Sequence, residues 1–167
     1  MALRNILTDE NPRLRKHAKP VTEITPKILA LLDDMAETMY AARGVGLAAP
    51  QVGVLRRVVV IDVGDGLIEL INPELISREG EDVDEEGCLS LPDKKGVVIR
   101  PKTVTVKALD RAGNEITVTG EDLLARALCH ETDHLEGILF MDKVIAPSLE
   151  ELTREDLEEL KKELAEG

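Results

Sequence analysis

Aromatic residues are almost absent from this sequence, since Tyr40 and Phe140 are the only two and tryptophan is missing. We therefore expect a core built from leucine, isoleucine, valine and alanine. Cysteine is equally scarce, because the chain has only Cys88 and Cys129, and this excludes a framework of several disulfides. In a reducing compartment, such cysteines are more often buried thiols or metal ligands.

Long apolar segments are also lacking. No stretch approaches the roughly 20 residues that a helix needs to span a bilayer. The N-terminal segment, MALRNILTDENPRLRKH, has no apolar region of the kind found in secretory signals. These absences predict a cytoplasmic protein that does not enter a membrane.

Basic residues are outnumbered, with 21 Lys and Arg against 33 Asp and Glu, so the net charge is −12. Proteins that bind nucleic acid regardless of sequence neutralise phosphates with Lys and Arg, so this charge argues against such a function. Its simplest consequence is solubility.

The length of 167 residues suits one domain with a sizeable core. Thr25 and Pro26 form a helix start signal, and apolar residues recur at helical spacing after them, which predicts a helix over residues 26–42. A second helix is predicted over residues 121–136, with Gly137 as its stop, and a final acidic helix over residues 153–165.

Short runs rich in Val, Ile and Thr predict strands. They cover residues 57–62, 67–71, 97–99, 103–109 and 115–118. Residues 44–53, GVGLAAPQVG, are predicted to be an irregular loop, Asn72-Pro73 to end a strand, and the acidic residues 77–87 to be a solvated loop. Short strands mixed with three helices predict an α+β fold in one domain.

The segment His130-Glu131-Thr132-Asp133-His134 carries the clearest chemistry. Residues four apart share one face of a helix, so both imidazoles can reach one metal ion. Glu131 lies about 100° further round the helix axis, where it can contact a water on the metal and act as general base. The alternative is a pair of core histidines, but the intervening glutamate favours a metal site.

A catalytic metal usually has three protein ligands and one open position. The metzincin pattern would place a third histidine at position 140, which is Phe140. His17, near the N-terminus, is expected to be a surface residue. Two alternatives remain for the third ligand: a downstream acid such as Glu150 or Glu151, or Cys88 in a glycine-containing loop. Cys129 points away from the ligand face and is expected to be a buried thiol.

Three segments together resemble the peptide deformylases. They are Gly44-Val45-Gly46-Leu47-Ala48-Ala49-Pro50-Gln51, Glu86-Gly87-Cys88-Leu89-Ser90 and His130-Glu131-Thr132-Asp133-His134. Their order and spacing, and the opening Ile6-Leu7…Pro12…Leu14-Arg15, are similar to that family over about residues 3–145. The resemblance implies a metallohydrolase that removes the formyl group from the initiator methionine of new bacterial polypeptides. It also implies short antiparallel strands around a central helix with the HExxH motif, followed by a C-terminal helix.

The resemblance implies roles for individual residues. Cys88, His130 and His134 would be the metal ligands, and Glu131 the general acid/base for attack by metal-bound water or hydroxide. Gln51 and the backbone N–H of Leu89 would bind the developing oxyanion. The family usually works with Fe(II), and Zn(II) or Ni(II) is expected in purified protein. One divalent metal per chain is therefore predicted.

The resemblance also implies a binding site for N-formylmethionyl peptides. Gly46 would contact the substrate, and the methionine pocket would be lined by Val45, Glu86, Leu123, Ala127 and the stem of Arg126. Lys95 stands where many relatives have arginine, and it is expected to touch the peptide backbone only at the rim.

The C-terminal segment departs from some relatives. They have a basic C-terminal helix suited to docking on the ribosome, whereas residues 148–167 contain eight acidic and three basic residues. Transient proximity to the ribosome is implied by the substrate, but docking through a basic helix is not expected. Neither a membrane nor a specific nucleic acid is an expected partner. The prediction is one catalytic domain over residues 1–167, with a core at 3–145 and the acidic helix at about 148–167.

Two other functions compete with this interpretation. One is a different HExxH metallohydrolase of the peptidase kind, against which the missing third His or Glu counts. The other is a non-catalytic metal-binding domain, which would normally have four protein ligands. Whether Glu131 faces the metal site distinguishes the catalytic from the structural alternative.

Overall fold

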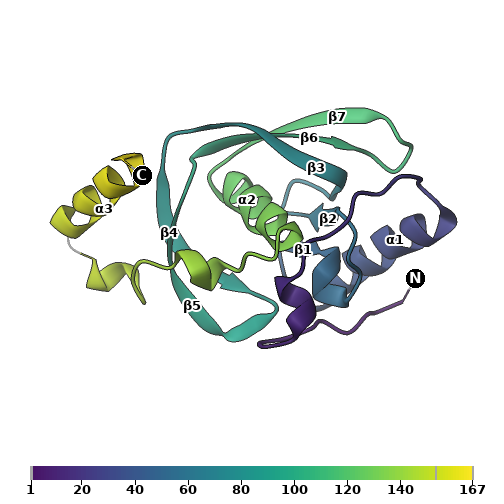
Figure 1. The fold of residues 1–167 in the computed structure, drawn as a ribbon, viewed down its shortest axis with the longest axis horizontal. Coiled ribbons are helices and arrows are strands. Elements are labelled where there is room, and N and C mark those ends of the chain that lie inside the picture. The colour runs from purple at the N-terminus through teal and green to yellow at the C-terminus, as the bar shows by residue number, and fades with distance from the viewer. Residues whose placement is uncertain (1, 153, 167) are drawn as a thin grey trace.

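The computed structural model describes residues 2–152 and 154–166 (Figure 1). The strands are β1 (Gly46–Ala48), β2 (Val58–Ile61), β3 (Ile68–Glu79), β4 (Asp82–Cys88), β5 (Leu91–Arg100), β6 (Thr103–Leu109) and β7 (Glu115–Glu121). The helices are α1 (Pro26–Ala41), α2 (Leu123–Leu135) and α3 (Arg154–Glu166), with short 3-10 turns η1 (Pro12–Arg15), η2 (Ala49–Val52), η3 (Phe140–Lys143) and η4 (Leu149–Glu151). The fold is α+β, as predicted.

The described strands form two antiparallel sheets. One has five strands in the order β1-β2-β3-β6-β7, and the other is the pair β4-β5. Figure 1 shows α2 enclosed by these strands, while α3 lies at one end of the molecule beside β4. The helix that contains the HExxH motif is therefore central, as the sequence resemblance implied.

Strand β2 lies between the two helical layers. Its four residues are all buried, and alternate side chains point to opposite faces of the sheet. Val59 and Ile61 pack in the cluster that contains α2, whereas Val58 and Val60 pack in the cluster that contains α1. This double burial explains why the strand reads as an unbroken apolar run.

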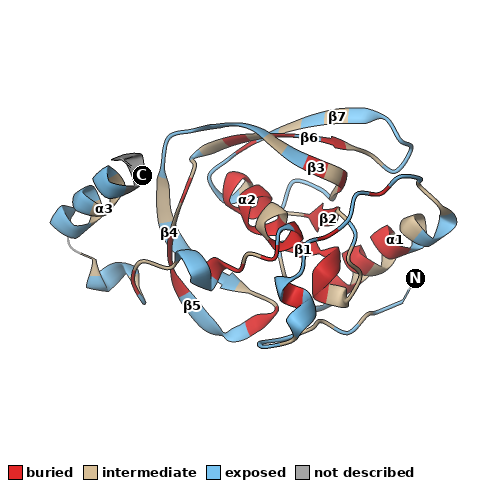
Figure 2. Cartoon of the chain, viewed as in Figure 1, coloured by how far each residue is buried: buried red, intermediate tan, exposed pale blue. Residues whose placement is uncertain are grey.

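Helix α1 begins and packs as the sequence predicts. The Thr25 hydroxyl accepts a hydrogen bond from the Ile28 backbone N–H, and Pro26 opens the first turn. The apolar residues that recur at helical spacing lie in the core, including Leu31, Leu32, Met35 and Met39. Figure 2 shows this burial on one side of α1 and over most of α2, whereas α3 is mainly exposed.

Three predicted breaks in regular structure are wrong. Residues 77–87 are not a loop, because β3 continues to Glu79 and β4 begins at Asp82 after a turn at Gly80. Many of the acidic side chains of this segment face solvent while the backbone pairs with β5 and β6. Residues 44–53 are likewise not irregular throughout, since they contain β1 and η2.

Asn72-Pro73 does not end β3 but lies in a bulge within it. The register with β6 shifts between Ile71 and Glu74, and Asn72 has a φ of 54°. The Asn72 side-chain amide hydrogen-bonds both the backbone N–H and the carbonyl of Val21, at 2.7 and 2.8 Å. These two bonds replace strand pairing, so the strand accommodates the proline and continues.

The C-terminal helix was predicted at 153–165 and is observed at Arg154–Glu166. Residue 153 of the predicted range lies outside the described residues. Among the described helices, none is both long and apolar enough to cross a membrane.

Candidate metal centre

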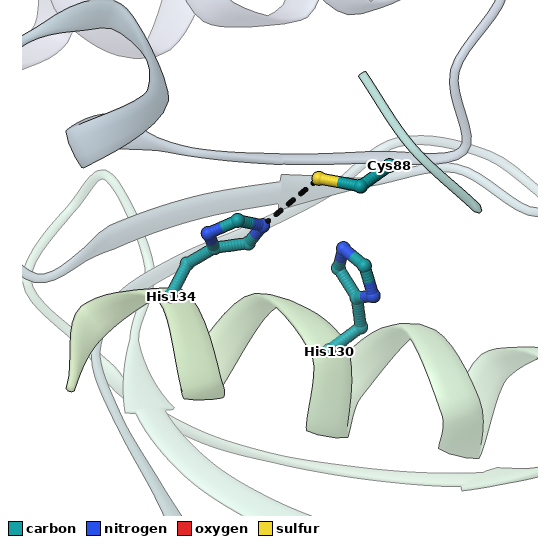
Figure 3. A group of neighbouring side chains, drawn as sticks. All are labelled: Cys88, His130 and His134. Carbon is teal, nitrogen blue, oxygen red and sulfur yellow. Dashed lines mark hydrogen bonds between the residues drawn. The ribbon is translucent and has the colours of Figure 1, made fainter. Parts of the chain in front are cut away.

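Three potential metal ligands converge between α2 and the end of β4. His130 and His134 lie one turn apart on α2, and Figure 3 shows both imidazoles directed toward Cys88. The potential ligand atoms of the three residues all lie within 4.8 Å of one another. The Cys88 Sγ and His134 Nε2 atoms are 3.4 Å apart. A thiolate and two imidazoles at such distances match the ligand set of a catalytic Zn(II) or Fe(II) site.

The electrostatic environment also suits a cation. Burial lowers the pKa of His134 well below its usual value, so this imidazole is neutral and can donate a lone pair. Burial also opposes charge on His130, but Glu131, Cys88 and Glu86 outweigh it and raise the pKa of His130 to about 10. The two rings lie only 5.0 Å apart. The site therefore favours one positive charge, which a bound metal would supply in place of the proton.

The orientation of the His130 ring is fixed by its contact with Glu86. Its Nδ1 lies 3.3 Å from Glu86 Oε2, so Nδ1–H donates to this carboxylate and Nε2 is left for a metal. The Arg100 guanidinium binds both oxygens of Glu86, at 2.8 and 2.9 Å. Burial opposes ionisation of Glu86, but hydrogen bonds from His130 and Arg100 outweigh it and lower its pKa to about 2. Glu86 is thus a fixed anion.

Arg100 connects this carboxylate to a second one. Its Nη1 donates to Asp133 at 2.7 Å, and Lys143 lies 3.1 Å from the same carboxylate. Asp133 belongs to the HExxH segment, so Arg100 ties β5 to the metal-binding helix. Arg100 is a functional residue that could not be recognised from the sequence. Its partners, Glu86 and Asp133, lie 14 and 33 residues away along the chain. The sequence around Arg100 therefore shows only a cation at the end of a strand.

Glu131 lies against β1. A Cβ atom on Gly46 would lie 2.5 Å from Glu131 Oε2, so only glycine permits this approach. Burial raises the pKa of Glu131 to about 7. Its Oε1 is buried and has no hydrogen-bond partner within the part of the chain that the structure describes. A buried carboxyl group with a free oxygen and a pKa near neutrality is suited to proton transfer.

The Gln51 amide is held in one orientation. Its Oε1 accepts a hydrogen bond from the Ala48 backbone N–H at 2.9 Å. Its Nε2 therefore points the other way, where it donates to Ser90 Oγ at 3.1 Å and lies 3.7 Å from Cys88 Sγ. Ser90, which the sequence analysis assigned no role, thus helps to direct an N–H donor toward the metal ligands.

A pocket of about 440 Å³ opens beside these groups. Except for His134, every site residue named from the sequence lines it: Val45, Gly46, Gln51, Glu86, Cys88, Leu89, Leu123, Arg126, Ala127, His130 and Glu131. The guanidinium of Arg126 is engaged by the carbonyl oxygens of Val98 and Asp82, which leaves its stem for the pocket.

The remaining His and Cys residues lie away from this centre. The His17 side chain is 76% exposed and contacts Glu136, so it is a surface residue as expected. Cys129 is buried in the cluster beneath α2, and burial raises the pKa of its thiol. Neither belongs to the described group of potential metal ligands.

Relatives of similar sequence include peptide deformylases. A peptide deformylase from Caldanaerobacter subterraneus subsp. tengcongensis is 61% identical over 161 residues, covering 96% of this chain and 99% of the relative. One from Acetivibrio thermocellus is 66% identical over 145 residues, covering 87% of this chain and 85% of the relative.

Solved structures agree with these relatives. The crystal structure of a peptide deformylase from Legionella pneumophila has a TM-score of 0.83 and 46% identity, covering 99% of both chains. That of the Thermotoga maritima enzyme has a TM-score of 0.83 and 41% identity, covering 85% of this chain and 97% of that one. Residues 3–150 match the family described as polypeptide deformylase. The chain therefore belongs to the polypeptide deformylase family of hydrolases.

Proposed function

We propose that Cys88, His130 and His134 hold one divalent metal, and that the adjoining pocket removes the formyl group from the initiator methionine of new polypeptides. The observation that carries this proposal is the convergence of these three ligands beside a buried Glu131 at one wall of the pocket. Three protein ligands leave the open position that a catalytic metal needs.

A metal held there would lower the pKa of a coordinated water toward neutrality. Glu131 accepts the proton of the attacking water on its carboxylate, whose pKa burial raises to about 7. It then delivers this proton to the leaving amine of methionine, which completes hydrolysis of the formyl amide. Gly46 is necessary because any side chain there would displace the carboxylate.

Gln51 and Leu89 stabilise the oxyanion that develops on the formyl oxygen. The Gln51 Nε2 is aimed by the hydrogen bond that fixes its Oε1 to the Ala48 N–H. Leu89 follows the ligand Cys88 directly, and its side chain packs on Gly44 at the opposite wall. Donors fixed before the reaction cost no reorganisation in the transition state.

The methionine side chain enters the part of the pocket formed by Val45, Leu123, Ala127, Glu86 and the stem of Arg126. β1 is an edge strand of the five-stranded sheet, so its open side at Gly46 is available to the peptide backbone. A peptide deformylase structure from Acinetobacter baumannii, 31% identical with a TM-score of 0.80, is bound to Met-Ala-Ser. We assign the same kind of peptide to this chain.

Metal loading tests the proposal. Apo-protein reconstituted under argon with Fe(II), Ni(II) or Zn(II) is expected to bind one ion per chain and to hydrolyse formyl-Met-Ala, fastest with Fe(II). In air, oxidation of Cys88 beside iron should lower this activity. Zn(II) matching Fe(II) would refute the iron assignment, while a lack of activity with every metal would refute the function.

A second arm separates deformylation from peptide-bond cleavage, the reaction of an HExxH peptidase. The same metal-loaded protein is incubated with formyl-Met-Ala-Ser, and the products are identified by mass. Formate and intact Met-Ala-Ser are expected, because the proposed pose places the formyl group beside Glu131 and the methionine side chain in the adjoining pocket. Release of free alanine or serine would instead support a peptidase.

The domain organisation yields another prediction. We assign catalysis to residues 3–145, since α3 contributes no residue to the pocket within its described side chains. The ion pair between Lys161 of α3 and Glu81, just before β4, is weak, with Lys161 Nζ 3.6 Å from the carboxylate. Truncation after Ser148 should keep kcat on formyl-Met-Ala within about twofold, with a slightly lower Tm. Loss of turnover in a truncated protein with unchanged circular dichroism would contradict it.

A further inference from the structure

The mouth of the pocket carries three cationic side chains that the proposed chemistry does not use. Arg43, Lys94 and Lys95 line the pocket and are exposed. Over residues 2–152 and 154–166, the structure places none of the three in an ion pair. The exposed acidic residue of the lining, Glu85, accepts a hydrogen bond from the Leu149 backbone N–H. Three cations against this one exposed carboxylate leave the rim locally positive, in a chain of net charge −12.

Arg43 occupies a backbone position that its own chemistry does not favour. Its φ is 57°, a left-handed conformation that glycine adopts without steric cost and that commonly ends helices as glycine. Hydrogen bonds from the Arg43 and Gly44 N–H groups to the carbonyls of Tyr40 and Met39 hold this turn at 3.0 Å. The backbone conformation does not explain why residue 43 is an arginine, so the explanation must lie in its side chain.

We infer that Arg43, Lys94 and Lys95 bind carboxylates on the residues that follow formylmethionine, so that the enzyme prefers nascent chains with acidic second and third residues. This inference rests on the proposed function. With the formyl group beside Glu131 and the methionine in its pocket, the rest of the peptide must leave past the rim. Arg43 is the first residue of the segment that forms one wall of the pocket. Lys94 and Lys95 belong to β5, which contributes another part of the lining.

The expected effect follows from the exposure of these cations. Each exposed charge pair contributes about two- to fivefold in affinity and is screened by salt. The contacts lie away from the bond that breaks, so they act equally on ground and transition states and change KM rather than kcat. The acidic chain as a whole repels anionic peptides, so a preference for them must come from local contacts.

The test compares C-terminally amidated formyl-Met-Glu-Glu, formyl-Met-Gln-Gln and formyl-Met-Lys-Lys at low and high ionic strength. The kcat/KM should fall in this order, by about fivefold or more between the first and the last, and the differences should shrink in high salt. Arg43→Glu should abolish or reverse the order. Arg43→Gly, which suits the positive φ, should weaken it in a stably folded protein.

Arg78→Glu is the matched control, because it makes the same charge change on an exposed part of β3 outside the pocket lining. It should keep the preference. Equal kcat/KM for the three amidated peptides, or an equal loss of preference in Arg78→Glu, would overturn the inference. The inference would also be overturned if the only faster substrate were formyl-Met-Gln-Gln with a free C-terminus. The rim would then bind only the terminal carboxylate. Failure to hydrolyse any formyl peptide would overturn the proposed function, and the inference with it.

Discussion

Glu131→Gln is expected to lower kcat on formyl-Met-Ala by at least ~100-fold while the protein still binds one metal ion per chain. Glutamine has nearly the same size as glutamate, so the close contact with Gly46 is kept. What is lost is the oxygen that accepts a proton from water and returns it to the amine. Metal content measured on the same sample separates loss of proton transfer from loss of metal.

The matched control is Glu136→Gln, the same change at the end of the same helix. Glu136 is exposed and pairs with Arg57 and His17, away from the pocket. Its replacement should leave kcat within about twofold, since exposed ion pairs contribute little. Retention of more than a tenth of kcat in a metal-loaded Glu131→Gln protein would refute the role of Glu131 as acid/base.

Local sequence signals were sufficient for the elements that depend on local contacts. Helix α1 was predicted from one capping residue, one proline and the spacing of its apolar side chains, all within 17 residues. The pairing of His130 with His134 needed only the helical repeat. In both cases the interacting groups are neighbours along the chain, so spacing decides which face they share.

Features made by distant segments were not accessible in this way. The acidic stretch at β4 is a strand because β5 supplies its backbone hydrogen bonds, and composition alone does not record a pairing partner. Cys88 reaches His134 across 46 residues, so spacing left Glu150 and Glu151 as alternatives until the resemblance was considered. The bulge at Asn72 depends on Val21, which is 51 residues away.

The buried ion network beneath the proposed metal ligands is the largest of these unpredicted features. Arg100 is 3% exposed, and its guanidinium binds Glu86 through two nitrogens and Asp133 through the third. Removing one partner of a buried charge network leaves the others desolvated without compensation. Without Arg100, Glu86 would keep, among the described residues, only His130 and a contact of 3.3 Å with Arg126, and Asp133 would keep only Lys143.

Arg100→Met is therefore expected to destabilise the fold by about 3–5 kcal/mol, because methionine fills the space of the side-chain stem but neutralises neither carboxylate. For a domain of this size, the corresponding decrease in Tm is roughly 10 °C, measured by thermal unfolding of the metal-free protein. The Tm of Arg100→Lys should lie between the Tm of the original protein and that of Arg100→Met. An ammonium group keeps the charge but cannot bind Glu86 through two parallel bonds.

Arg111→Met is the control that tests whether the loss of stability depends on burial of the arginine. Arg111 also binds two carboxylates, Glu69 and Asp33, at 2.6 and 2.7 Å, but its side chain is 43% exposed. Water and salt ions can solvate the carboxylates that Arg111 leaves behind. The free energy of unfolding is therefore expected to fall by less than about 1 kcal/mol. A second substitution, Glu86→Gln in the Arg100→Met protein, should recover part of the lost stability by removing a buried charge that has lost its two strongest hydrogen bonds. If Arg100→Met and Arg111→Met lowered Tm equally, the buried network would not stabilise the metal centre as argued.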